Sequence, residues 1–309
     1  MNENSNPTLL FCHSSNKRTQ AAVKKLERDI ELLNFNELFF TDSGLYRADM
    51  QLVDFSNYGR VIFFPSLQGP YKFALIKYLK EFYPTTKLRN IPNVPECKWN
   101  WENKFDLFLA IRCFGIENIN LPKTLAVNYQ AEPAQVVKFA GAYLGHYPFV
   151  VKPSWGSQGR SVKLVTNEAE LLNLLLDAQK TDRLFYLTNM LLIQQMIKPK
   201  IQEDLRVIML KDKVIGGMKR ASKKEGEFRN NYSLGGSISK HDVSEPEIID
   251  FVKSFQQKTG LPSIGFDLIR DENEQLYLLE ITTLPQVNGF ESVTAIKFFE
   301  MRLHDLLED

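Results

Sequence analysis

The sequence predicts a mixed α/β protein with a small leading α/β domain and a larger second part. Three observations carry this prediction. Residues 8–65 alternate between strand, helix and strand patterns, which is typical of a small α/β domain. Residues 147–165 are predicted to form two strands around a glycine-bearing loop. Residues 204–220 and 264–282 each have the pattern of a two-stranded hairpin.

The composition favours an ordinary soluble protein. The 309 residues allow two or three packed domains or layers, and the net charge of +1 gives no sign of a nucleic-acid partner. The three cysteines are odd in number and lack paired metal spacing, which fits a reducing cytoplasm. The first residues do not resemble a signal peptide, and no apolar run approaches the roughly 20 residues that span a bilayer. We therefore expect a cytoplasmic protein.

The leading part, residues 1–95, is expected to be the small α/β domain. A buried strand is predicted at 8–14, a helix from Lys17 to Leu33, strands near 37–41 and 60–65, and a helix from Tyr71 to Phe82. The last of these strands, VIFFP, is continuously apolar, as in a sheet covered on both faces. Prolines then make residues 83–101 an irregular connection, in which we place the main boundary.

The second part, residues 96–309, is expected to contain two subdomains at about 104–190 and 191–309. Its predicted helices share an apolar period near that of an α-helix and lie at 102–114, 134–144, 168–180, 244–259 and 291–307. Thr166 or Asn167 is placed to cap the third helix. Ser244 is expected to open a capping box for the fourth, which stops at Gly260.

The hairpin at 264–282 carries two acids that a symmetric loop would place on one face. With a loop of two or four residues, Asp267 and Glu280 are diagonal neighbours, and Thr282 shares their face. Two carboxylates aimed at one place repel unless a cation or a proton lies between them, so the pattern suggests a magnesium site. A pair of solvated acids is the alternative. An odd-length loop would put the two acids on opposite faces.

Two further groups point to phosphate chemistry. Residues 154–160 form a loop with two glycines, which can bring backbone N–H groups close to phosphates, and Lys152 precedes it. The Gly-Lys-Ser/Thr ending of a P-loop is absent, and a simple hairpin is the alternative. Asp204 and Arg206 share one face of a strand, where the arginine can bind an anionic substrate or form a surface ion pair. A basic run follows at 219–229.

The order of these segments resembles a known family. PFVVKPSWGSQGRSV, EDLRVIMLKDKVIGGMKR, GEFRNNYSLGGS, GFDLI and LLEITTLPQVNGFE follow one another over about residues 104–294. Together they resemble the ATP-grasp superfamily, and within it the RimK-type ligases, which join an amino acid to the carboxyl end of a peptide or small acid. The resemblance implies an ATP-grasp fold, with an N-terminal α/β pre-ATP-grasp domain and two α+β subdomains that clasp ATP.

The resemblance also implies roles for individual residues. Arg206 matches the arginine that meets the acyl phosphate, and Arg229 is a second candidate to stabilise the anionic intermediate. Asp267 and Glu280 match the magnesium-binding acids, while Thr282 stands where the family has a metal-binding asparagine. The residues that match nucleotide contacts are Lys104, Lys152, Gln195, Met196, Asp204, Arg229, Asn230 and Asn231.

The implied function is an ATP-dependent carboxylate–amine ligase that forms an amide bond through an acyl phosphate. Its cofactors would be ATP and Mg²⁺, with Mn²⁺ as the other metal, and its substrates a carboxylate acceptor (a peptide or small acid) and an amino-acid amine. No nucleic acid or membrane partner is expected, and a homo-oligomer is left open. Two alternatives remain: a ligase that closes rings in a ribosomally made peptide, and a nucleotide-binding protein with impaired catalysis. Thr282 and Gln286, which stands where the family has glycine, motivate the second.

Overall fold

The computed structural model divides the chain into two compact units. The first is Met1–Lys98 with Lys297–Asp309, and the second is Trp99–Ile296. The domain limits expected above, at residues 95 and 96, remain a prediction. The structure describes residues 7–12, 17–26, 28–34, 37–41, 43–64, 70–89, 98–128, 130–156, 161–181, 190–222, 236–283, 285 and 287–308. Within these ranges, none of the helices combines the length and the apolar character needed to cross a bilayer.

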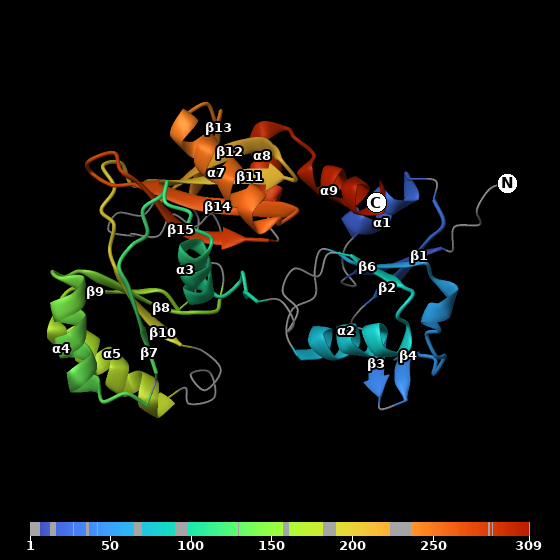
Figure 1. Ribbon diagram of the computed structural model, residues 1–309, viewed down its shortest axis with the longest axis horizontal. Helices are drawn as coiled ribbons and strands as arrows, with labels where there is room; N and C mark the ends of the chain where they lie inside the picture. The colour runs from blue at the N-terminus through green and yellow to red at the C-terminus, as the bar shows by residue number, and fades with distance from the viewer. Residues whose placement is uncertain are drawn as a thin grey trace. The chain divides into compact units, whose positions relative to one another are not determined.

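The first unit is a parallel sheet with helices on both faces (Figure 1). Its strand order is β2-β1-β5-β6, and a separate β3–β4 hairpin lies beside it. The elements are β1 (Thr8–Cys12), α1 (Lys17–Lys24), β2 (Ile30–Asn34), β3 (Leu38–Thr41), β4 (Gly44–Arg47), a 3₁₀ turn η2 (Phe55–Asn57), β5 (Arg60–Phe63), α2 (Pro70–Phe82), β6 (Lys87–Arg89) and α9 (Phe298–Glu308).

Both faces of this sheet are buried, as the apolar runs predicted. Leu9 and Phe11 of β1 pack with α2 in one cluster, whereas Leu10 and Cys12 pack with α1 and α9 in another. Successive strand residues point to opposite faces, so a continuously apolar strand requires a cover on each side.

One helix of this unit is shorter than expected. The period that predicts a helix from Lys17 to Leu33 was wrong after residue 24, because the chain forms β2 from Ile30. Leu33 pairs with Phe11 in the parallel ladder, and its side chain is buried. The spacing of three residues between Ile30 and Leu33 also fits one face of a helix, but pairing with β1 overrides that local preference.

The second unit contains two antiparallel sheets. In the first, of order β7-β10-β8-β9, helices α4 and α5 pack against the sheet and bury residues such as Phe149 (Figure 1). The elements of this layer are β7 (Thr124–Val127), α4 (Pro133–Leu144), β8 (Phe149–Pro153), β9 (Lys163–Val165), α5 (Glu168–Thr181) and β10 (Leu191–Gln195), and α3 (Lys104–Cys113) precedes them in the chain. Asn167 Oδ1 accepts a hydrogen bond from Glu170 N and so caps α5, as expected.

The second sheet, of order β13-β12-β11-β14-β15, is covered on one face by α3 and α7. Phe251 and Phe255 of α7 pack edge-on against Phe266 of β14, deep in this core. Its elements are β11 (Glu203–Leu210), β12 (Lys213–Ala221), β13 (Ser237–His241), α7 (Pro246–Thr259), β14 (Ser263–Arg270), β15 (Leu276–Thr282) and α8 (Asn288–Thr294).

Two helix boundaries correct the expectations. The N-cap of α7 is Glu245 rather than Ser244, and its carboxylate lies 3.0 Å from His241 Nε2 instead of capping the helix. The single helix expected at 291–307 is two helices, α8 and α9. Ala295 has a φ of 59°, in the left-handed region, and ends α8.

Gly265 of β14 lies where a side chain would collide with its neighbours. A Cβ atom there would be 3.0 Å from Pro285 Cβ and 3.1 Å from Thr282 Cγ2. We expect Gly265→Ala to lower the free energy of unfolding by about 1–3 kcal/mol, as overpacking does. The control is Gly141→Ala in α4, where nothing lies within 4 Å and a small gain is expected. Urea unfolding of both variants checks this, and an equal response would contradict it.

Candidate functional site

The two acids of the β14–β15 hairpin face each other, but by a different route from the one predicted. Arg270 pairs with Leu276, so the loop has odd length, and the expected diagonal register was wrong. On that register alone the two acids would lie on opposite faces. A β-bulge after Asp267 shifts the pairing, and Asp267 lies directly opposite Glu280. Thr282 lies opposite Gly265, and thus on the same face.

A second bulge brings another charged pair into register. The β11–β12 hairpin starts with Leu210 opposite Lys213, and a shift between Ile208 and Met209 then sets Asp204 opposite Arg220. Without that shift Asp204 would oppose the residue before Arg220, and the guanidinium would lie on the other face. The sheet therefore carries a row of charged side chains on the face opposite its apolar core.

Four of these side chains form one buried ion-pair network. Arg206 binds Asp267 through two parallel hydrogen bonds, Nε to Oδ1 and Nη2 to Oδ2, each 2.7 Å. Arg220 donates from Nε to Asp204 Oδ1 at 2.5 Å, and its Nη2 lies 3.1 Å from Asp267 Oδ2. Two guanidinium groups thus hold two carboxylates. The alternative that Asp204 and Arg206 form a surface ion pair is wrong, because Asp204 is buried.

The network sets the protonation of its members. Burial alone would raise the pKa of Asp267, but the charges and hydrogen bonds of Arg206 and Arg220 prevail and hold it well below its usual range. Burial raises the pKa of Asp204, against the charge of Arg220. Burial also opposes the charge of Arg220, yet Asp267 and Asp204 raise the pKa of that guanidinium. Asp267 and Arg220 therefore remain a charged pair at neutral pH.

A buried lysine lies in the other sheet of this unit. Lys152 of β8 donates from Nζ to Gln194 Oε1 at 2.9 Å, and Gln194 Nε2 donates to Thr124 Oγ1 at 2.7 Å. Burial and the nearby charge of Lys104 lower the pKa of Lys152 to about 8, while the charge of Glu280 opposes this shift. An ammonium that has lost its water is ready to bind an anion.

Lys104 links the glycine loop to the acids. It is the first residue of α3, and its side chain is buried. Its Nζ donates to Gly156 O at 2.7 Å and lies 3.7 Å from Glu280 Oε1. The predicted nucleotide-binding lysines and the predicted metal-binding Glu280 are thus neighbours, although they are far apart in the sequence.

Of the remaining predicted site residues, the structure describes only some. Gln195 ends β10, where its backbone N–H donates to Lys123 O at 2.9 Å, and Met196 follows it; both are half-buried. Arg229, Asn230 and Asn231 lie outside the described residues, as does Gln286.

Two residues that complete the site were missed. Gln194 positions Lys152, and Arg220 joins Asp204 to Asp267, although we placed Arg220 only in a basic run. The polar Gln194 directly after the apolar run LLI in β10 is a signal that could have found the first residue. The role of Arg220 could not be found in this way, because it depends on the register shift between Ile208 and Met209.

The charges suit a polyanion together with a divalent cation. Lys104, Lys152, Arg206 and Arg220 are opposed by Asp204, Asp267 and Glu280, an excess of one positive charge. The oxygens of Asp267 and Glu280 are the ligand type that Mg²⁺ prefers. Three guanidinium contacts already occupy Asp267, and within the described ranges no three acid, histidine or cysteine side chains form a metal cluster. The donors therefore fit Mg²⁺ when an anionic ligand supplies further oxygens.

Removing one guanidinium from the network should be costly. We expect Arg220→Met to lower the free energy of unfolding by about 3–5 kcal/mol, because it leaves Asp204 and Asp267 buried with one partner between them. Arg270→Met is the control, since Arg270 pairs with Glu247 at 3.0 Å on the surface and should cost less than about 1 kcal/mol. Urea unfolding measures both, and similar losses would refute the burial argument.

Known proteins share this architecture. Residues 105–303 match the family described as RimK-like ATP-grasp domain. The chain is 30% identical over 190 residues to a protein of Nitrosococcus oceani named probable alpha-L-glutamate ligase, covering 61% of this chain and 58% of that protein. The chain thus spans less than two thirds of that curated relative.

Solved structures extend the likeness of fold to the whole chain. The macrocyclase MdnC of Microcystis aeruginosa, bound with precursor peptide MdnA, has a TM-score of 0.64 at 14% identity and covers 98% of this chain and 100% of its own. The ATP-grasp ligase PsnB, complexed with minimal precursor, Mg and ADP, has a TM-score of 0.58 at 14% identity, covering 99% of each chain. The expected ATP-grasp fold is confirmed, and the chain belongs to the RimK-like ATP-grasp family.

Proposed function

We propose that this protein is an ATP-dependent carboxylate–amine ligase that forms an amide bond through an acyl phosphate. The observation that carries the proposal is the buried Asp267, gripped by Arg206 and directly opposite Glu280, next to the two lysines. Glutamate is the proposed amine, because the relative from Nitrosococcus oceani carries the name of a glutamate ligase. The acceptor is a peptide or a small acid.

The charged groups would act by binding and positioning. Phosphoryl transfer needs charge neutralisation and alignment rather than covalent help from the protein. Lys104 and Lys152 would bind the phosphates of ATP while a substrate carboxylate attacks the γ-phosphorus and ADP leaves. The amine then attacks the acyl phosphate and phosphate leaves, which gives the amide. Mg²⁺, or Mn²⁺ in its place, would neutralise phosphate charge when bound, held by Glu280 and Asp267 with Thr282 beside them.

Arg206 has a second part in this proposal. Its two donors are engaged by Asp267, so an anionic substrate must recruit them from that carboxylate. Arg220 would remain on Asp204 and keep Asp267 charged and in place during the exchange. Arg229, with Asn230 and Asn231, is proposed to act on the phosphates. Gln195 and Met196 would hold the adenine, with Asp204 near the nucleotide.

Ring closure within one peptide is the second candidate, because the fold is shared with a macrocyclase bound to its precursor peptide. Both reactions pass through an acyl phosphate. They differ only in whether acid and amine belong to one molecule.

An assay with ATP, Mg²⁺, single amino acids and acidic peptides tests the function. We expect ADP release that requires both an acid and an amine, with glutamate added to the acceptor in the product mass. A peptide that loses only water would indicate ring closure. Nucleotide binding without ADP formation across the panel would overturn the ligase and favour a non-catalytic role.

The acid opposite Asp267 offers a cleaner test than Asp267 itself. Glu280 does not touch the guanidinium network, so Glu280→Gln should leave the fold intact and lower ADP formation at least about 100-fold. The matched control is Glu274→Gln in the same hairpin, whose exposed side chain pairs with Lys200. Circular dichroism monitors folding, and unchanged turnover in Glu280→Gln would exclude the assigned metal role.

The lowered pKa of Lys152 predicts a pH dependence of nucleotide binding. Since the free protein loses this charge around pH 8, affinity for a non-hydrolysable ATP analogue should fall roughly tenfold between pH 7.5 and 9. Lys152→Arg should flatten that profile, because arginine stays charged. Lys163→Arg, an exposed residue of β9, should retain the wild-type profile. Calorimetric titrations measure it, and a flat wild-type curve would contradict the assignment.

A further inference from the structure

A cavity of about 450 Å³ lies in the first unit, apart from every residue proposed for ligation. It is lined by residues at the carboxyl ends of β1 and β2, the edge at which open parallel sheets bind ligands. Its volume is within the range of ligand pockets, roughly 300–1,000 Å³. The position and the volume of the cavity are therefore those of a ligand-binding site.

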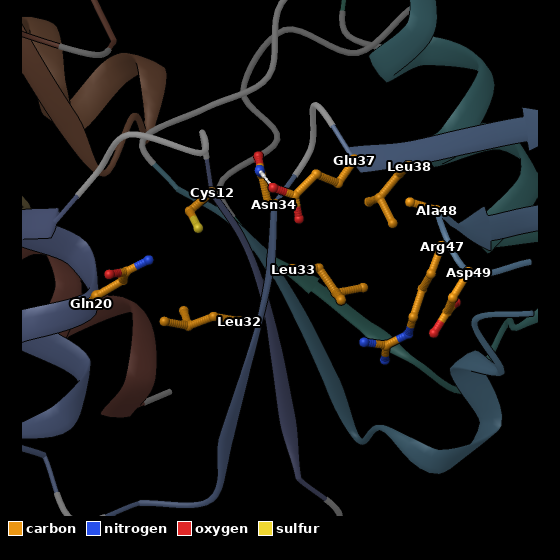
Figure 2. Close-up of a pocket in the computed structure, with 10 residues that line it drawn as sticks. All are labelled: Cys12, Gln20, Leu32, Leu33, Asn34, Glu37, Leu38, Arg47, Ala48 and Asp49. Atoms are coloured by element: carbon orange, nitrogen blue, oxygen red, sulfur yellow. Dashed lines mark hydrogen bonds between the residues drawn. The ribbon is translucent and has the colours of Figure 1, made fainter. Parts of the chain in front are cut away.

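The cavity opens around the outer edge of β2. In the sheet order β2-β1-β5-β6, β2 is the terminal strand. Figure 2 shows Leu32 pointing toward Gln20 on one side of the strand, and Leu33 pointing toward Arg47 and Asp49 on the other. A ligand in this cavity would thus lie along the strand edge, with groups on both faces.

The outer edge of β2 presents backbone N–H and C=O groups that do not face β1. Thr8 N donates to Asp29 O at 3.0 Å, so residues 29, 31 and 33 turn their backbone groups toward β1. The N–H and C=O groups of Ile30 and Leu32 then point outward. Among the described residues none makes a backbone hydrogen bond to those outward groups. An edge of this kind is a template for another strand.

The side chains of the cavity select the charge of such a strand. Arg47 is already neutralised by Glu31, whose other oxygen accepts from Tyr58. Glu37 accepts from the neutral amide of Asn34, and the charge of Asp49 acts on Arg47, which Glu31 already pairs. In the described part of the chain, neither Glu37 nor Asp49 forms an ion pair of its own. Asp49 lies on the Leu33 side of β2, and Glu37 lies at the carboxyl end of the strand, beside Asn34 (Figure 2). The Leu33 side and this end of the strand therefore favour cationic groups, and the Leu32 side favours an apolar one.

We propose that the edge of β2 binds an extended peptide as an added strand, with basic side chains on the Leu33 face and apolar side chains on the Leu32 face. Backbone hydrogen bonds to Ile30 and Leu32 would supply affinity, and Glu37 and Asp49 would select alternating basic residues. This goes beyond the proposed function, since it requires neither ATP nor any ligase residue.

Fluorescence anisotropy with the full-length protein and no nucleotide tests the proposal. The probe is a fluorescein-labelled hexapeptide of alternating valine and lysine. We expect it to bind, and the double variant Glu37→Gln, Asp49→Asn to weaken binding about tenfold or more, as loss of two charge contacts does. The matched control is Glu81→Gln, an exposed acid of α2 outside the cavity, which should bind as the wild type does.

Four further probes separate strand addition from simple charge attraction. A hexapeptide with three valines followed by three lysines keeps the composition and loses the alternation, and an alternating valine–glutamate peptide reverses the charge. Two N-methylated probes remove the N–H donors from one edge or the other. We expect weaker binding of the first two, and weakening by only one N-methylated form.

Any of three binding results would overturn the proposal. These are equal binding of the alternating and block peptides, no effect of the double variant, and no binding of the alternating probe at millimolar concentration. A concentration-dependent dimer in light scattering that the probe does not dissociate would also overturn it, because a second copy would then occupy the edge. None of these outcomes depends on ADP formation, so failure here is distinct from failure of the ligase.

Discussion

The site depends on two buried carboxylates that two guanidinium groups bind on one face of a sheet. Asp204 and Asp267 could not be buried alone, because isolated charges lose too much hydration free energy. Arg220 lies between them and Arg206 binds the second through two hydrogen bonds, so each charge is matched at close range. Pairs of this kind are costly to break and contribute little to stability when intact, which points to a functional reason for them.

That network also explains why the remaining groups are cationic. With Asp204 and Asp267 neutralised, Lys104 and Lys152 outweigh Glu280, and the site carries a net positive charge. The ammonium group of Lys104 donates a hydrogen bond to Gly156 O and forms an ion pair with Glu280. It therefore links the start of the glycine loop to the β14–β15 hairpin. An anionic ligand can enter such a site without the protein supplying new charge. Relief of the repulsion between the two lysines would add to its binding.

The first unit adds a separate surface. The family match begins at residue 105, and most of this unit precedes it. Its buried core is held by aromatic contacts such as Phe11 on Phe63, with ring centroids 5.3 Å apart. The edge of β2 lies outside that core, which leaves its backbone groups available for a partner.

The sequence by itself determined the fold class, the glycine-loop hairpin, the family and the residue types of the site. It could do so because apolar period, turn residues and motif order are local properties. It also placed Asp267, Glu280, Lys104 and Lys152 in one group through the resemblance. It misjudged the residues after Lys24, where an apolar spacing suited both a helix and a strand, and pairing with β1 decided between them.

Only the tertiary structure decided how the charged residues meet. The register of each hairpin is set by where a bulge falls, and a shift of one residue moves a side chain to the other face. The bulge after Asp267 aligns that residue with Glu280 despite an odd loop, and the shift in β11–β12 aligns Asp204 with Arg220. Bulge positions depend on packing against neighbouring strands, which no local pattern in the sequence records.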